Sequence, residues 1–195
     1  MPMFWPTLMG LSGLFSIYPR KNLWKSMRYP LLIDTGLLSL FIILKGDIYT
    51  QIRFLTETIM AVVPNILGFI LTGYTVIVSV TESKYLKLMV KPLPNKKVTL
   101  YQIVNSTFAM VLLTLCTTLL VGFVANYMVK ANLTILDSLT RYTNILNALS
   151  LFVLLFFFLY AVFAIKDVVI NVFNFGQFIN KMESEGDEET REQED

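Results

Sequence analysis

The sequence predicts an all-α integral membrane protein with four transmembrane helices. Of its 195 residues, 55% are hydrophobic and only 15% are charged, whereas charged residues make up about a quarter of an ordinary soluble domain. The charges are also segregated, because none falls within 101–128 or 142–165. A helix needs about 20 apolar residues to cross about 30 Å of hydrocarbon. Runs of this length therefore indicate a chain that is inserted in a bilayer.

The N-terminal region, 1–29, combines an apolar segment with a basic cluster. Residues 1–18 are apolar but short, and two prolines interrupt them. We expect an interfacial or re-entrant segment, with Trp5 and Tyr18 at the depth of the lipid headgroups. If this segment crossed the membrane instead, only the extreme N-terminus would change sides.

The transmembrane domain, 30–165, is expected to hold four spans. We place them at about 30–44, 57–80, 101–128 and 142–165.

The first span is short and contains an acidic residue. Pro30 suits the first turn of a helix, and Asp34 would then lie near the helix N-terminus, where negative charge is favoured. The sequence therefore favours a structural role for Asp34 over the functional role that intramembrane acids often have.

Two segments follow the fourth span. Residues 166–182 are expected to form a juxtamembrane amphipathic helix, which either lies along the membrane surface or continues the fourth span. Residues 183–195 contain eight acids and no aromatic residue, so they cannot bury enough surface to fold alone. We expect this acidic tail to be disordered.

The distribution of basic residues predicts the orientation. With four spans, the N-terminal segment, the 81–100 loop and the C-terminal tail share one side and hold twelve Lys or Arg, against four on the other side. Lys and Arg are enriched in cytoplasmic loops. Both termini are therefore expected to be cytoplasmic.

A stripe of small and polar residues runs along the second span at steps of four and three. Its members are Ala61, Asn65, Gly68, Thr72, Thr75, Ser79 and Glu82. Small residues let helices approach closely in lipid, and Thr or Asn can hydrogen-bond across the contact. Three interpretations remain open: packing within one subunit, packing between subunits, or the lining of a narrow polar pathway.

The third span carries a matching set of small and hydroxyl residues. We expect this set to face the stripe and to hold the helices together, with Gly68, Thr72, Thr75 and Ser79 on one side of the contact. The third span contributes Thr107, Thr114, Thr118, Gly122 and Ala125.

Enzymatic chemistry has little support in the sequence. The chain contains no His, which rules out Ser–His, Cys–His and His-dependent zinc sites, and it has no Gly-rich phosphate-binding loop. Cys116 is the single cysteine and cannot form an internal disulfide. We expect no catalytic residue, no metal site and no cofactor. The spans lack a ring of charge or a filter-like loop, and with four spans a channel would need oligomerisation.

The cytoplasmic face is expected to contact a partner or lipid, because basic residues near a membrane attract anionic lipid and an acidic tail attracts basic protein surfaces. The residues concerned are Lys84, Lys87, Lys91, Lys96, Lys97, Glu188 and Glu189.

The layout resembles a family of bacterial membrane proteins from anti-phage defence operons. Four spans in about 200 residues, cytoplasmic termini and the segment NILGFILTGYTVIVSVTESKYL at 65–86 are similar to KwaA, the membrane subunit of the Kiwa system. The resemblance implies a homo-oligomer, expected to be a tetramer, in the bacterial inner (plasma) membrane. It also implies a sensor of phage attachment that holds a cytoplasmic DNA-binding partner, KwaB.

The expected function is therefore a non-enzymatic membrane sensor and scaffold that binds copies of itself, a cytoplasmic effector and membrane lipid, without direct contact to nucleic acid. The alternative is a pore-forming effector or small channel that depolarises the membrane.

Overall fold

The computed structural model describes residues 10–18, 20–80, 89–90, 98–131 and 143–192; the side chains of 20–22, 80 and 182–192 are left aside. The described part of the chain is all-helical. It comprises α1 (Gly10–Ile17), α2 (Arg20–Ile43), α3 (Ile48–Val80), α5 (Leu100–Lys130) and α6 (Thr143–Glu192).

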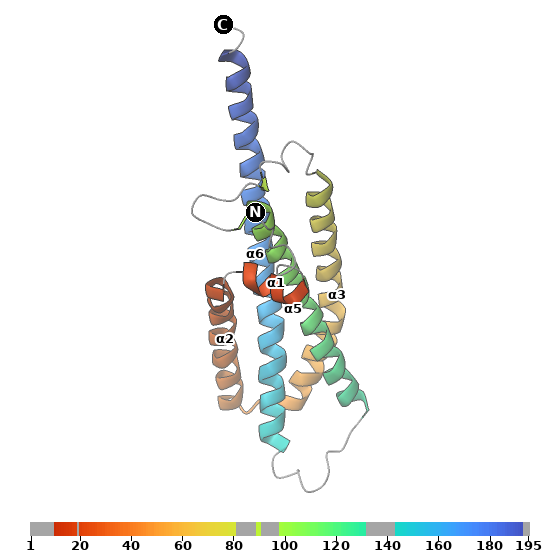
Figure 1. Ribbon diagram of the computed structural model, residues 1–195. Helices are drawn as coiled ribbons and strands as arrows, with labels where there is room; N and C mark the ends of the chain where they lie inside the picture. Colours follow the sequence, from red (N-terminus) through yellow and green to blue (C-terminus); the bar gives the residue numbers. More distant parts are fainter. Residues whose placement is uncertain (1–9, 19, 81–88, 91–97, 132–142, 193–195) are drawn as a thin grey trace.

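The four long helices form an antiparallel bundle, and α1 lies across it (Figure 1). The C-terminal end of α3 and the N-terminal end of α5 lie at one end of the bundle, from which α6 projects (Figure 1). Helix α5 contacts α1, α3 and α6, while α6 also contacts α2 and α3. Helices α5 and α6 therefore form the centre of the fold.

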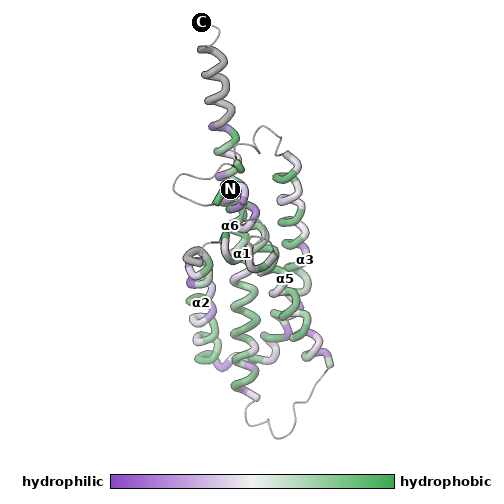
Figure 2. The backbone as a smooth tube through the Cα atoms, viewed as in Figure 1, coloured by the Kyte–Doolittle hydropathy of each residue, from purple (hydrophilic) through white to green (hydrophobic). Residues whose placement is uncertain are grey.

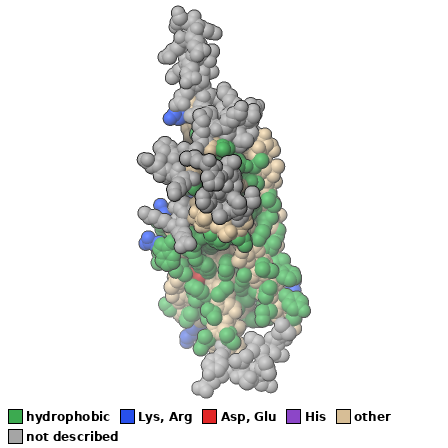
Figure 3. Space-filling view, in the orientation of Figure 1, with side chains coloured by type: hydrophobic (Ala, Val, Ile, Leu, Met, Phe, Trp, Pro, Cys, Tyr) green, Lys and Arg blue, Asp and Glu red, His purple; other side chains and the backbone are tan. Residues whose placement is uncertain are grey.

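Four helices are long and apolar enough to cross a membrane, as the sequence predicts. They cover Leu23–Ile43, Ile48–Ser79, Leu100–Lys130 and Thr143–Lys181. Only 11–39% of the residues in their most apolar windows are buried inside the bundle, so most of the apolar surface points outward. Hydrophobic residues dominate the described helices (Figure 2) and cover much of the visible face (Figure 3). This surface is typical of a multi-pass membrane protein.

Helix α2 begins ten residues earlier than the predicted start of the first span. It starts at Arg20, so Pro30 lies inside the helix and not in its first turn. Lys, Arg, Leu and Met in 20–29 are good helix formers, and a membrane helix tolerates an internal proline when neighbouring groups compensate for the lost donor. The expectation for Pro30 was therefore wrong.

Helix α6 continues beyond the predicted fourth span without a break. Of the two alternatives for 166–182, the structure has the continuation of the span (Figure 1). The backbone of 183–192 is also helical, which corrects the expectation of disorder there. Extending an existing helix avoids the cost of nucleation, and Glu, Gln and Arg are good helix formers.

A tight turn joins α2 to α3. The Gly46 N–H donates to the Phe41 carbonyl at 3.1 Å, and Lys45 has a left-handed backbone with φ of 52°, as in helix C-caps of the Schellman type. A Cβ on Gly46 would collide with the Phe41 ring. A larger residue at position 46 would therefore require the Phe41 ring to move.

Asp47 caps the next helix. Its carboxylate accepts hydrogen bonds from the Thr50 hydroxyl and from the backbone N–H groups of Tyr49 and Thr50. These bonds, chiefly those from Thr50, hold the pKa of Asp47 below its ordinary value. The cap is thus present at neutral pH and is lost only as the pH falls through that lowered pKa.

The bundle is closest packed where α3 and α6 meet α5. Gly122 of α5 faces the Ile59 side chain of α3, and a Cβ at position 122 would collide with it. Ile59 and Leu115 are fully buried. The Thr118 hydroxyl lies 3.2 Å from the Phe157 carbonyl of α6, so one turn of α5 contacts both neighbouring helices.

We expect Gly122→Ala to lower the free energy of unfolding by about 1–3 kcal/mol, because the added methyl must displace a fully buried side chain. The matched control is Gly36→Ala, since a Cβ there has no neighbouring atom within 4 Å. Thermal unfolding in detergent, followed by circular dichroism, measures both. Equal effects of the two substitutions would contradict the packing described for Gly122.

Candidate functional site

The stripe on α3 lies on the outside of the bundle. Its described members are all exposed: Ala61, Asn65, Gly68, Thr72, Thr75 and Ser79. The buried residues Ile59, Val63 and Ile70 of the same helix point to the core. Because each helical residue turns the side chain by about 100°, Ala61 points about 200° away from Ile59. The stripe therefore faces away from α5 and α6, which argues against packing of the stripe on these two helices within one subunit.

The polar groups of the stripe bond to their own helix. The hydroxyls of Thr72 and Thr75 each donate to the carbonyl four residues earlier, both at 2.9 Å. The Asn65 side-chain amide likewise donates to the Ala61 carbonyl at 2.8 Å. The Thr hydroxyl protons are thus satisfied within the helix, whereas the exposed Asn65 side chain has a further N–H and a carbonyl oxygen beyond the bond to Ala61.

The matching residues of α5 face a different surface, which corrects the expected contact. Thr107, Thr114, Thr118 and Gly122 are buried inside the bundle, and Gly122 meets Ile59 on the opposite side of α3 from the stripe. Two small-residue faces therefore exist. One closes the core of a single subunit, while the other is open.

The predicted partner-binding residues are only partly covered by the structure. Lys84, Lys87, Lys91, Lys96 and Lys97 lie outside the described residues. Glu188 and Glu189 belong to the last turns of α6, and of these two residues only the backbone is described.

Asp34 lies deep in α2, fourteen residues after its first residue, Arg20. The prediction that it lies near a helix N-terminus was wrong, because the helix starts earlier. The side chain is 0% exposed, and within the described part of the chain neither carboxylate oxygen has a hydrogen-bond partner. A buried polar group without a partner is costly, and an ionised one within a membrane span costs more.

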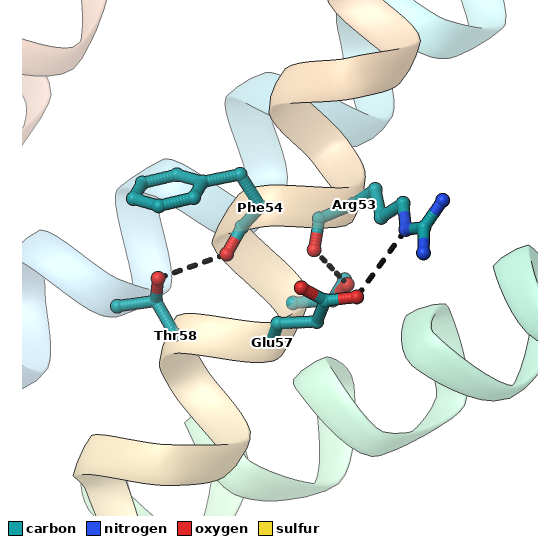
Figure 4. A network of polar contacts seen from close by, with 5 residues as sticks. Arg53, Phe54, Glu57 and Thr58 are labelled. Carbon is teal, nitrogen blue, oxygen red and sulfur yellow. Dashed lines mark hydrogen bonds and ion pairs between the residues drawn. The ribbon is translucent and has the colours of Figure 1, made fainter.

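An ion pair lies in the N-terminal part of α3, before the stripe. Arg53 and Glu57 form an ion pair at 3.3 Å, with side chains 67% and 53% exposed (Figure 4). The same close-up shows the Thr58 hydroxyl bonded to the Phe54 carbonyl (Figure 4). An exposed pair of this kind contributes little to stability, which agrees with a solvated span edge.

A polar cavity between α2, α5 and α6 was not expected from the sequence. Lys25, Ser26 and Tyr29 of α2 line it on one side, and Lys166 and Asp167 of α6 on the other. The sequence signal is the Lys–Asp pair directly after the charge-free stretch 142–165. Only the packing of α2 against α6 shows that Lys25 is its neighbour.

Known catalytic or metal-binding arrangements do not emerge from the described residues. No group of three or more Cys, Asp or Glu with metal-binding geometry occurs among them, and Cys116 is exposed in a membrane-spanning helix. No protein-family model matches the sequence, and comparisons with curated proteins and with solved structures give no match either.

Asp34→Val should raise the free energy of unfolding by about 1–3 kcal/mol, because it removes a buried carboxyl group that has no partner. Asp34→Asn is the control, since it keeps a polar group of the same size at the same place. Thermal unfolding in detergent measures both variants. A less stable Val variant would show that the carboxyl group is held by an interaction outside the described chain.

Proposed function

We propose that this chain is a non-enzymatic membrane scaffold and sensor that assembles with copies of itself and binds a cytoplasmic effector. The observation that supports it best is the open stripe on α3. Small and polar residues occupy an outward helix face in a chain whose other outward residues are largely bulky and apolar. In lipid, small residues allow close helix contact, and no other helix of the described part of the chain covers this stripe.

The shape of this face suits a second copy of α3. Bulky exposed side chains flank the stripe, with Phe69 and Val76 on one edge and Leu71 and Val78 on the other. The side chains of the stripe between them, centred on Gly68, are therefore shorter than those on either edge. The heptad spacing of its residues favours helix packing at about +20°.

Asn65 adds a polar reason for self-association. The residue is exposed on a helix long and apolar enough to span the membrane, and its bond to the Ala61 carbonyl uses only one of its amide N–H groups. Unsatisfied polar groups are costly in hydrocarbon, and Asn side chains can hydrogen-bond across a helix contact. A second copy would offer the same donor and acceptor in return.

The cytoplasmic side of the proposal follows from the basic residues and from α6. Twelve of the sixteen Lys and Arg lie on the side that holds both termini if the four helices span the membrane, which favours a cytoplasmic location. Helix α6 projects from the bundle at the end where α3 terminates (Figure 1). Its acidic end, 183–192, would therefore be offered to a cytoplasmic protein with a basic surface.

The resemblance to the Kiwa membrane subunit supplies the biological context of the proposal. It implies a protein of the bacterial inner membrane that belongs to an anti-phage complex, forms a tetramer and senses phage attachment. The effector would be a DNA-binding protein of the KwaB class.

Gly68→Leu and Thr72→Leu should each weaken assembly, because a bulky side chain in the stripe keeps two helices apart. Light scattering of the protein in mild detergent should show a shift from oligomer toward monomer. Thr35→Leu is the matched control, because Thr35 is also exposed on a membrane-spanning helix and also donates to a carbonyl four residues earlier. An unchanged oligomer in both stripe variants would overturn self-association through α3.

Truncation after Met182 should reduce the capture of a co-expressed KwaB-class protein without reducing membrane insertion, because it removes eight acidic residues. A full-length variant with Glu188→Lys and Glu189→Lys separates charge from length and should lose capture as well. Pull-down from solubilised membranes measures both. Equal capture by all three proteins would remove the tail from the proposal, and loss of membrane potential on expression alone would favour a pore.

A further inference from the structure

The polar cavity has the composition of an anion site at a membrane surface. It has a volume of about 270 Å³ and lies where α2, α5 and α6 meet, next to the C-terminal end of α1. Lys25 and Lys166 line it together with Tyr29 and Asn171. Two basic residues and two residues with neutral hydrogen-bond donors thus border one space from two helices.

Asp167 is the acidic residue of this wall, and other groups already engage it. The Ser26 hydroxyl donates to Asp167 Oδ2 at 2.9 Å, and Lys166 Nζ lies 3.8 Å from Asp167 Oδ1. Burial and, secondarily, Asp167 raise the pKa of Tyr18 to about 12, so its phenol stays protonated at neutral pH. With two lysines against one carboxylate, the described cavity wall carries a net charge of +1.

The cavity lies at the depth expected for lipid headgroups. Lys166 is the first charged residue after the charge-free stretch 142–165 of α6. On α2, Lys25 and Tyr29 precede the mainly apolar stretch that starts at Pro30. Tyrosine is enriched at membrane interfaces, and Ile103 and Ile170 line the same cavity. Its wall is therefore part polar and part apolar, as a site for a lipid headgroup and the adjoining start of the acyl chains requires.

We propose that this cavity binds the headgroup of an anionic phospholipid of the phosphatidylglycerol type. Lys25 and Lys166 would hold the phosphodiester through charge-assisted hydrogen bonds, while Tyr29 and Asn171 would bond to the glycerol hydroxyls. The volume lies just below the range of about 300–1,000 Å³ for sites that enclose drug-sized ligands, so it admits a headgroup and leaves the acyl chains in the bilayer. The bound lipid would join α2 to α6.

Native mass spectrometry of the full-length protein, delipidated and then titrated with phosphatidylglycerol, tests this site. We expect Lys25→Gln and Lys166→Gln each to weaken binding about tenfold, the loss of one charge-assisted contact. Lys130→Gln, which removes an identical charge from the opposite end of the bundle, should leave the affinity within about twofold. Thermal unfolding of each variant shows that the fold is retained.

Asp167→Asn separates an anion site from a general polar cavity. The amide oxygen can still accept the Ser26 hydroxyl, while one negative charge leaves the wall, so phosphatidylglycerol should bind as tightly as before or more tightly. Weaker binding of this variant would overturn the proposal.

Parallel titrations with phosphatidylethanolamine and with inorganic phosphate complete the test. Clear preference for phosphatidylglycerol over both supports a site for an anionic lipid. Equal binding of phosphatidylethanolamine would overturn the charge argument, and competition by millimolar phosphate would assign the cavity to a soluble anion. If Lys130→Gln lost as much affinity for phosphatidylglycerol as Lys25→Gln and Lys166→Gln, the attraction would be nonspecific and the proposed site would be overturned.

Discussion

The contact of α5 with its two neighbours is the constraint on which the rest of the bundle depends. Thr118 is fully buried and lies within hydrogen-bond distance of a carbonyl on α6, and one turn later Gly122 allows α3 to approach. Lipid tails are as apolar as the helices, so hydrophobic burial does not drive helices together in a bilayer. Close packing and a few internal hydrogen bonds must do so instead, and α5 supplies both from one face.

The same residue types have two different roles in this chain. On α5 they close the interior of the subunit, and on α3 they form an outward stripe, although both sets consist of Gly, Ala, Thr and similar residues at helical spacing. The sequence predicted that both faces are suited to close packing, but it could not predict that they do not face each other. That depends on which side of α3 carries Ile59, Val63 and Ile70, whose bulk fills the core.

The presence and approximate positions of the four spans could be predicted because long apolar runs are a local property of the chain, although α3 begins at Ile48 and not near residue 57. The start of α2 could not, because Pro30 resembles a helix start and only the helical backbone of 20–29 shows otherwise. The wrong prediction that Asp34 lies near a helix N-terminus had the same cause. The helical end of α6 was not predicted, because the composition of 183–195 was judged as that of an isolated segment. Residues 183–192 instead continue a helix that is already formed. The polar cavity could not be predicted either, because the two lysines that line it, Lys25 and Lys166, lie 141 residues apart along the chain.

The length of α6 has a mechanical consequence. A helix rises 1.5 Å per residue, so the part of α6 after Phe175, its last buried residue among those described, extends for about 25 Å to Glu192 as a helical stalk. A protein bound at its C-terminal end would be kept at a fixed distance from the bilayer. Tilting of the buried part of α6 would displace that end further than the buried part itself. Several such stalks in one assembly would also raise the local concentration of binding ends for a partner with repeated surfaces.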